Sequence, residues 1–300
     1  MSSRPRALVT GLSGFTGRYM ERALTEGGYE VFGIGSHPSD SPGYFTVDLE
    51  DRSALSKAVT EVRPDVVVHL AGIAFVGHAD AGDFYRVNLI GTRNLLEALA
   101  HCAHVPRCVL LASSANVYGN AKGGPLTEDS PTAPANDYAV SKLAMEHMAR
   151  LWAHRLPVVM VRPFNYTGVG QSDRFLLPKI VEHFRQGRQV IELGNVDVAR
   201  DFSDVRSVVD AYMRLLRIAP AGGTFNICSG KAVSLQQALD MMEEIAGYRI
   251  EVRINPDFVR ANEVKCLHGD RTRLDAALGA MPWISLNDTL RWMYESREPA

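Results

Sequence analysis

Short apolar runs alternate with longer amphipathic segments along the first half of the chain. The apolar runs predict strands, because a strand covered by helices on both faces is apolar along its whole length. They span residues 6–10, 29–34, 65–70, 108–112 and 158–161. The amphipathic segments predict helices that end near residue 26 and that cover 84–100 and 139–154. Strands that alternate with helices indicate an α/β fold with a doubly wound parallel sheet.

The second half of the chain has a less regular pattern. It predicts helices at 174–186 and 235–246 and strands at 189–193, 225–228 and 249–254. The segment 201–216 looks like a return to the first domain. We therefore expect a second, smaller α/β domain that is partly interleaved with the first. The first domain is expected at 1–164 and about 200–218, and the second at 165–199 and 219–300.

A cluster of glycines joins the first predicted strand to the first predicted helix, in the pattern Gly-x-x-Gly-x-x-Gly. Such a loop lets the backbone approach a pyrophosphate at a helix N-terminus, where N–H groups and the helix dipole favour negative charge. A glycine cluster alone can be a tight turn, but the strand before it and the helix after it support dinucleotide binding. The expected contacts are Gly11, Ser13, Gly14, Phe15, Thr16 and Gly17.

A tyrosine and a lysine lie four residues apart at Tyr138 and Lys142, so a helix would place them on one face. A phenol has a pKa of about 10, and a nearby ammonium favours its ionised form. Tyr138 can then give or take a proton during catalysis. Ser114 follows an apolar strand and can hydrogen-bond a substrate oxygen, with Ser113 as the neighbouring candidate. We expect Ser114, Tyr138 and Lys142 to be catalytic.

The composition is that of an ordinary globular protein, with 46% hydrophobic and 22% charged residues. A formal net charge of −2 gives no electrostatic reason to expect a nucleic acid partner. No apolar run approaches the roughly 20 residues that a membrane span needs, and the chain starts without an apolar signal segment. The four cysteines are scattered and lack zinc-site spacing, so we expect buried thiols, no metal site and a cytoplasmic location.

Taken together, these motifs resemble the extended, sugar-nucleotide-modifying branch of the short-chain dehydrogenase/reductase family. The resemblance covers nearly the whole chain, in the family's order and at roughly its spacing. Its pieces are Thr10–Gly17, Val47–Leu49, His69–Gly72, Val87–Asn88 with Gly91–Thr92, Ser113–Gly119, Tyr138–Lys142 and Arg162–Asn165. It implies a Rossmann dinucleotide-binding domain followed by a domain that holds a nucleotide sugar. It also implies that Asp48 and Leu49 bracket the adenine and that Leu70, Ala71 and Gly72 lie along the ribose and pyrophosphate.

The residue at the end of the second strand selects between the two nicotinamide cofactors in such domains, because an acid there binds the ribose 2′-hydroxyl and repels a 2′-phosphate. Here the strand ends without an acid at Gly35 or Ser36. Ser36, His37 and Arg18 could contact a phosphate. We therefore favour NADP(H), with Ser36 as a contact, and keep NAD as the alternative. The resemblance implies that Tyr138 and Lys142 also contact the cofactor.

The family contains dehydratases, epimerases and reductases. The 4,6-dehydratases carry Thr-Asp-Glu before Val-Tyr-Gly, and that acid pair removes water. Here the corresponding positions are Ser114, Ala115 and Asn116, and neither alanine nor asparagine can move the proton. A Ser-Ser-Ala pattern is typical of both 4-epimerases and 4-ketoreductases. The missing acid after the second strand argues against permanently bound NAD, so we expect a reductase and keep the epimerase as the alternative.

The segments 193–204 and 255–260 resemble GDP-mannose 4,6-dehydratases and their partner reductases. The resemblance implies reduction of the C4 ketone of GDP-4-keto-6-deoxy-D-mannose to GDP-D-rhamnose, with a 6-deoxytalose product as the alternative. A diphosphate needs cationic partners, which favours Arg200 and Arg260. The other expected substrate contacts are Ser114, Asn165, Lys179 and Glu263.

Two further expectations concern the assembly and a different class of function. The helices at 84–100 and 139–154 resemble those that form a four-helix interface in this family, so we expect a homodimer. Leu95, Leu96 and Leu99 fall on one stripe of the first of these helices, although the same stripe could pack on the chain's own sheet. A catalytically silent, NADP-sensing regulator is the alternative of another class, and the intact Tyr138–Lys142 pair argues against it.

Overall fold

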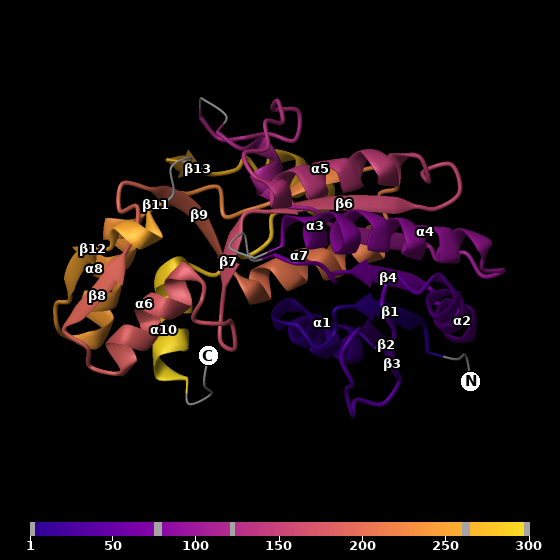
Figure 1. The fold of residues 1–300 in the computed structure, drawn as a ribbon, viewed down its shortest axis with the longest axis horizontal. Helices are drawn as coiled ribbons and strands as arrows, with labels where there is room; N and C mark the ends of the chain where they lie inside the picture. The colour runs from indigo at the N-terminus through magenta and orange to yellow at the C-terminus, as the bar shows by residue number, and fades with distance from the viewer. Residues whose placement is uncertain (1–3, 75–79, 121–123, 260–264, 297–300) are drawn as a thin grey trace. The chain divides into compact units, whose positions relative to one another are not determined.

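The computed structural model describes residues 4–74, 80–120, 124–259 and 265–296. The chain divides into two compact units (Figure 1). The first unit contains Met1–Gly119, Thr132–Pro163 and Val209–Phe225, and the second contains Asn120–Pro131, Phe164–Val208 and Asn226–Ala300. None of the helices that the structure describes is long and apolar enough to cross a membrane.

A seven-stranded sheet has the order β10-β6-β5-β4-β1-β2-β3. These strands are β1 (Arg6–Thr10), β2 (Glu30–Gly35), β3 (Tyr44–Thr46), β4 (Val66–His69), β5 (Cys108–Ala112), β6 (Val158–Pro163) and β10 (Thr224–Ile227). β1 pairs in parallel with both β2 and β4, and β5 pairs in parallel with β4 and β6. The strand order reverses between β1 and β4, and ligands of doubly wound sheets bind at such a point. The predicted α/β fold class is confirmed.

One face of this sheet is covered by α2 (Arg52–Val62), α4 (Thr92–His101) and α5 (Asp137–Arg150). Their apolar side chains form a core with alternate strand residues such as Leu8 and Val67, because neighbouring residues of a strand point to opposite faces. Leu95, Leu96 and Leu99 are fully buried in this core. The leucine stripe therefore packs on the chain's own sheet, which corrects its use as evidence for a dimer. Helix α1 (Phe15–Glu26) packs on β1 and β2.

The segment expected as one helix at 84–100 contains two helical forms. After the short α3 (Ala81–Asp83), the backbone forms a π-helix, η1 (Phe84–Gly91), and then continues as the α-helix α4. A π-helix bonds each carbonyl to the N–H five residues on and usually forms only a single turn. The hydrophobic pattern did not distinguish the two forms, because a segment of eight residues is too short for the two helical periods to be told apart.

The second unit contains two smaller sheets around their own core. One has the order β11 (Ala232–Ser234), β9 (Ala199–Asp204) and β13 (Cys266–Leu267), with β7 (Asn165–Thr167) also on β9; the other pairs β8 (Val190–Leu193) with β12 (Glu251–Ile254). The core is packed by α6 (Leu176–Arg185), α8 (Leu235–Ala246) and α10 (Leu286–Glu295). The second unit also contains η3 (Pro256–Phe258) and α9 (Thr272–Leu278), whereas η2 (Ala115–Tyr118) belongs to the first unit and α7 (Val205–Ile218) continues from the second unit into the first.

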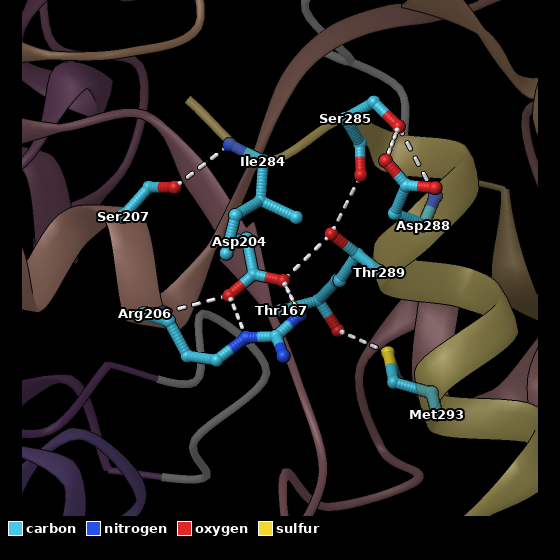
Figure 2. A network of polar contacts seen from close by, with 9 residues as sticks. All are labelled: Thr167, Asp204, Arg206, Ser207, Ile284, Ser285, Asp288, Thr289 and Met293. Carbon is cyan, nitrogen blue, oxygen red and sulfur yellow. Dashed lines mark hydrogen bonds and ion pairs between the residues drawn. The ribbon is translucent and has the colours of Figure 1, made fainter. Parts of the chain in front are cut away.

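A buried carboxylate, that of Asp204, joins three elements of the second unit (Figure 2). It accepts hydrogen bonds from the backbone N–H of Arg206 at 2.7 Å, from Nη2 of the same residue at 2.6 Å and from Oγ1 of Thr289 at 2.8 Å. The Arg206 guanidinium also lies 3.7 Å from the ring centroid of Trp292. Asp204 thus ties the end of β9 and the start of α7 to helix α10.

The segment 120–131 belongs to the second unit, whereas the sequence placed it within the first domain. Leu126 explains this position: its N–H donates to the carbonyl of His268 at 3.0 Å, and its carbonyl accepts from the N–H of Asp270 at 2.9 Å. Asn226 Nδ2 donates to the same carbonyl at 2.8 Å. These partners are about a hundred residues or more away along the chain, so no local pattern could reveal them.

The cysteines differ from expectation at one position. Cys102, Cys108 and Cys228 are buried thiols, as expected, but Cys266 is exposed. Cys266 lies on β13, which pairs with β9 at one end of the β11-β9-β13 order of the four-stranded sheet.

Candidate active site

The glycine loop connects β1 to α1 at the point where the strand order reverses. Gly11 has a left-handed backbone with φ of 73°, and its N–H donates to the carbonyl of Ile34 at 2.8 Å. A Cβ added at Gly17 would lie 2.2 Å from the carbonyl oxygen of Gly11, so α1 starts in direct contact with the loop. In the described part of the chain, the N-cap of α1 is Gly14 and no side chain caps it. The loop therefore has the form of an anion cradle at a helix N-terminus.

The turn at Leu70–Gly72 follows β4 and lies against this loop. A Cβ on Gly11 would come within 2.9 Å of the N atom of Ala71, and that N–H donates to Oγ1 of Thr10 at 3.2 Å. A Cβ on Gly72 would lie 3.2 Å from Nζ of Lys142. The structure thus brings the glycine loop, the expected pyrophosphate and ribose contacts and the candidate catalytic lysine close together in the first unit. These residues fit a dinucleotide that runs from the loop toward Lys142.

A buried histidine lies directly before this turn. His69 Nδ1 is 2.6 Å from Oγ1 of Thr10, and its Nε2 is 2.8 Å from Oγ1 of Thr92. Burial, assisted by the positive charge of Lys142, lowers the pKa of His69 to about 3. His69 is therefore neutral near pH 7 and links β1, β4 and α4 by hydrogen bonds. Its buried position gives His69 a packing role beneath the turn at Leu70–Gly72.

Asn88, on the π-helical segment, extends this polar chain to the candidate catalytic helix. Its Oδ1 accepts from the N–H of Ile73 at 3.0 Å, and its Nδ2 donates to Oγ of Ser141 at 3.1 Å. Ser141 in turn donates to the carbonyl of Tyr138 at 2.7 Å. Asn88 therefore fixes the turn after β4 relative to the backbone that carries Tyr138. The sequence identified Asn88 only as part of the family resemblance.

Helix α5 presents the tyrosine and the lysine together. It starts at Asp137, two residues earlier than expected, because the side chain of Asn136 accepts a hydrogen bond from the N–H of Ala139 and caps the helix. Tyr138 and Lys142 are each only 7% exposed. The ammonium of Lys142 donates to the carbonyl of Ala112, at the end of β5, over 2.9 Å.

The charge on Lys142 reflects two opposing influences. Burial lowers the pKa of Lys142 to about 8, while the carboxylate of Glu146, one helical turn further on, opposes the shift. The ammonium therefore remains mostly protonated at pH 7. A charged group fixed four residues from Tyr138 favours the ionised phenol, which is the arrangement that proton transfer by Tyr138 needs.

The two serines after β5 point to different partners. Ser113 Oγ donates to Oε1 of the fully buried Glu146 at 2.6 Å, so its hydroxyl faces the interior. Ser114 is the N-cap of η2, and its Oγ accepts from the N–H of Asn116 at 3.1 Å. This bond leaves the donor hydrogen of Ser114 available for another oxygen. The geometry favours Ser114 over Ser113 as the substrate-facing hydroxyl, although its catalytic role stays a prediction.

A buried ion pair supports the catalytic segment, and the sequence did not identify it. Arg162 Nη2 donates to Oε2 of Glu146 at 2.6 Å, and its Nη1 donates to the hydroxyl of Tyr118 at 2.9 Å. Together with Ser113, these contacts join β5, η2, α5 and β6. The turn that carries Ser114 is thus anchored on both sides to the helix that carries Lys142. The hydrophobic periodicity could not reveal this pair, because a charged residue within a helix or strand pattern predicts an exposed position and not a buried one.

The residues expected around the adenosine lie beyond the ends of β2 and β3. Ser36 is exposed directly after β2, with its Oγ 3.2 Å from Nδ1 of His37. Asp48 is exposed, and its Oδ1 accepts from the N–H of Glu50 at 2.9 Å. Leu49 is buried in the core beside the start of α4. Their contacts to a cofactor stay predictions.

The expected substrate contacts that the structure describes belong to the second unit, apart from Ser114. Asn165 begins β7. Arg200 is largely buried on β9, and its Nη1 donates to the carbonyls of Ala199 and Lys265 at 2.9 and 3.3 Å. Lys179 Nζ donates to the carbonyl of Glu192 at 2.7 Å and lies 4.6 Å from the ring centroid of Phe258. Arg260 and Glu263 lie outside the described residues.

Known proteins resemble this chain over nearly its whole length. A model of the NAD dependent epimerase/dehydratase family matches residues 7–228. GDP-6-deoxy-D-talose 4-dehydrogenase of Aggregatibacter actinomycetemcomitans is 35% identical over 296 residues, which cover 97% of this chain and 98% of the relative. GDP-6-deoxy-D-mannose reductase of Pseudomonas aeruginosa is 34% identical over 299 residues, with 95% of each chain covered.

Solved structures agree with these relatives and carry both nicotinamide cofactors. A candidate epimerase from Burkholderia cenocepacia J2315 shares 53% identity at a TM-score of 0.91, with 98% of each chain covered. RMD from Pseudomonas aeruginosa, complexed with NADPH, shares 33% identity at a TM-score of 0.84, covering 97% of this chain and 98% of that chain. MoeE5, complexed with UDP-glucuronic acid and NAD, shares 28% identity at a TM-score of 0.87 over the same shares.

The family model, the relatives and the solved structures lead to one assignment. They agree with the glycine loop at the strand-order reversal and with the tyrosine–lysine helix beside it. The chain belongs to the NAD-dependent epimerase/dehydratase family, the extended branch of the short-chain dehydrogenases/reductases, and is an NAD(P)-dependent oxidoreductase.

Proposed function

We propose that this protein reduces the C4 ketone of a nucleotide-linked 4-keto-6-deoxyhexose, with Ser114, Tyr138 and Lys142 as the catalytic residues. The observation that carries the proposal is the buried Tyr138–Lys142 pair next to a turn that contains Ala115 and Asn116. A tyrosine poised to move a proton suits carbonyl reduction. The absence of acids from that turn leaves no group for the elimination of water.

The residues of the first unit divide the reaction between them. Bound NAD(P)H supplies the hydride to C4. Ser114 donates its hydroxyl hydrogen to the C4 oxygen and orients the ketone. Tyr138 gives its proton to that oxygen as negative charge develops there. Lys142, held by the carbonyl of Ala112, stabilises the phenolate that Tyr138 becomes and binds the nicotinamide ribose.

The substrate that we propose is GDP-4-keto-6-deoxy-D-mannose, reduced to GDP-D-rhamnose. Mannose and talose differ only at C4, so the GDP-6-deoxy sugars named for the two relatives give the same 4-ketone on oxidation. That shared ketone supports the GDP-linked substrate, while the configuration of the product at C4 separates rhamnose from 6-deoxytalose. In the second unit, Asn165, Lys179 and Arg200 are the proposed contacts, together with Arg260 and Glu263.

The proposal is tested by following NADPH and NADH oxidation at 340 nm with GDP-, UDP-, CDP- and dTDP-linked 4-keto-6-deoxy sugars. We expect the fastest oxidation with the GDP-linked ketone, and NMR of the product assigns the configuration at C4. Protein that is isolated with tightly bound NAD and interconverts sugar nucleotides without net hydride consumption would instead be a 4-epimerase. Turnover that persists unaltered in Tyr138→Phe would favour the catalytically silent, NADP-sensing regulator, because Tyr138 would then not be the source of the observed reaction.

We also propose that the protein is a cytoplasmic homodimer. Two apolar side chains on the family's interface helices are exposed, Ile90 on η1 at 44% and Val140 on α5 at 38%, and both would be covered by a second copy. The buried thiols of Cys102 and Cys108 suit a reducing compartment. Light scattering after size exclusion should give twice the chain mass for the wild type. Ile90→Glu should give the monomer mass if this surface is the interface.

A further inference from the structure

The end of β2 contains an unusual packing arrangement around Gly35. The N–H of Gly11 donates to the carbonyl of Ile34, so the glycine loop starts beside the last residue of β2. In dinucleotide-binding domains, the side chain at this strand end reaches the adenosine ribose, and an acid there repels a 2′-phosphate. Gly35 has no side chain, so another residue must supply whatever contact this position makes.

Tyr44, the first residue of β3, occupies the space that a side chain at Gly35 would need. A Cβ added to Gly35 would lie 2.2 Å from the hydroxyl oxygen of Tyr44, and one added to Gly33 would lie 2.6 Å from its Cδ2. The ring therefore runs along β2 from Gly33 to Gly35. Leu12 of the glycine loop packs on the same face, since its Cδ2 would lie 2.5 Å from a Cβ on Gly33. An acid cannot stand at position 35 unless Tyr44 is first displaced or shortened.

The hydroxyl of Tyr44 is buried and has no hydrogen-bond partner among the residues that the structure describes. Buried polar groups in folded proteins are nearly always hydrogen-bonded, so such an exception calls for an explanation. The position of this hydroxyl supplies one, because it lies where the ribose-selecting side chain would stand. A phenol offers one donor and one acceptor, and unlike a carboxylate it does not repel a phosphate.

We propose that Tyr44 is the cofactor-selecting residue of this chain: its ring takes the place of the strand-end acid, and its hydroxyl is the group offered to the 2′ position of the adenosine ribose. Tyr44 and Gly35 then act as one unit that admits the 2′-phosphorylated dinucleotide. The inference rests on the proposed use of a nicotinamide cofactor and deepens it by naming what selects NADP(H). Ser36 and His37, exposed just after Gly35, add polar groups beside the same position.

The test compares Gly35→Asp, Tyr44→Ala and the double variant with the wild type. The dissociation constants of NADPH and NADH are measured by fluorescence titration of the full chain without sugar, and the melting temperature is measured without cofactor. We expect Gly35→Asp to lower the melting temperature and weaken both cofactors, since the aspartate meets the Tyr44 hydroxyl. In the double variant, the melting temperature should return toward that of Tyr44→Ala alone. The cofactor preference of the double variant should shift toward NADH about a hundredfold. Purely additive effects of the two substitutions would overturn the proposal.

A milder variant keeps the test informative if Gly35→Asp does not fold. Tyr44→Phe removes only the hydroxyl. We expect about tenfold weaker NADPH binding, little change for NADH and no loss of apo stability, because an unpartnered buried hydroxyl is removed. Tyr248→Phe is the matched control, as the Tyr248 hydroxyl donates to the carbonyls of Phe184 and Arg188 in the second unit and should leave both dissociation constants unchanged.

The outcomes separate this inference from the proposed function. Equal binding of NADPH by Tyr44→Phe and by the wild type would overturn the role of the hydroxyl. A wild-type protein that prefers NADH at least tenfold would overturn the assignment to Tyr44 but leave the reductase standing. A wild-type protein that binds neither dinucleotide would overturn both.

Discussion

Replacement of Gly17 by alanine should cost the protein much of its affinity for the dinucleotide. A Cβ at this position would lie 2.2 Å from the carbonyl oxygen of Gly11 and 2.3 Å from that of Leu12, whereas ordinary contacts begin at 3.4 Å. The difference between 3.4 and 2.2 Å means that the start of α1 must retreat from the loop by about 1.2 Å. Both obstructing atoms belong to the backbone, so no side-chain rotation can relieve the clash.

A hydrogen bond between a backbone N–H and a phosphate oxygen has an optimal length of about 2.9 Å. A retreat of this size would lengthen it to about 4.1 Å, which is beyond the range of a hydrogen bond. Each hydrogen bond to a charged group contributes about 1.5–3 kcal/mol. The loss of one such bond raises Kd roughly ten- to a hundredfold. We therefore expect at least a tenfold increase in Kd for NADPH and for NADH alike, because both share the pyrophosphate.

The assay is a fluorescence or calorimetric titration of the purified variants, with the melting temperature of the apo protein as a check on folding. Gly124→Ala is the control, since a Cβ there meets nothing within 4 Å and should leave Kd unchanged. Gly14→Ala should lie between the two, as its Cβ would be 3.1 Å from the oxygen of Gly11. Wild-type affinity in Gly17→Ala with an unchanged melting temperature would refute the cradle assignment.

Three further results are expected. Tyr138→Phe should lower kcat about 10²- to 10⁴-fold while the Kd for NADPH changes far less, because proton transfer is the main loss; a loss of NADPH binding as large as the loss of kcat would contradict this role. Glu146→Gln leaves the buried guanidinium of Arg162 uncompensated and should destabilise the fold by about 3–5 kcal/mol in urea titrations, against less than about 1 kcal/mol for Glu182→Gln in a partly exposed pair. His69 has a pKa of about 3 in the folded protein and 6.5 when unfolded, so below pH 6.5 only the unfolded chain gains its proton. Unfolding free energy should therefore fall by up to about 1.4 kcal/mol per pH unit between pH 6.5 and 3, and an unchanged slope in His69→Gln would exclude this contribution.

The sheet could be predicted from the sequence because its strands carry their own signal. β1 and β5 have the predicted bounds, since each is a short apolar run covered on both faces. Helix α8 also has the predicted bounds, because Ser234 and Gln237 form a capping box at its start and Gly247 follows its end. Local rules determine these elements, so a single sequence is sufficient to place them.

The parts that could not be predicted depend on distant contacts. β7, β11 and β13 contain two or three residues each, too few for a period of two to be visible. The Glu146–Arg162 pair and the Tyr44 ring on Gly35 arise only when separate elements are brought together. The sequence revealed the missing acid at Gly35, but only the packing of β3 shows that a phenol stands in its place.

Asn88 lies on the π-helix at Phe84–Gly91, so the number of residues in this segment affects the geometry of the site. Each residue of a helix turns the chain by roughly 100°, so a single deletion between Asn88 and the start of α4 would rotate Asn88 relative to α4. Asn88 could then no longer face both Ile73 and Ser141, which it contacts now. Substitutions at exposed positions of this segment should therefore be tolerated, whereas insertions and deletions should not. The number of residues between Asn88 and α4 determines where the Asn88 side chain points.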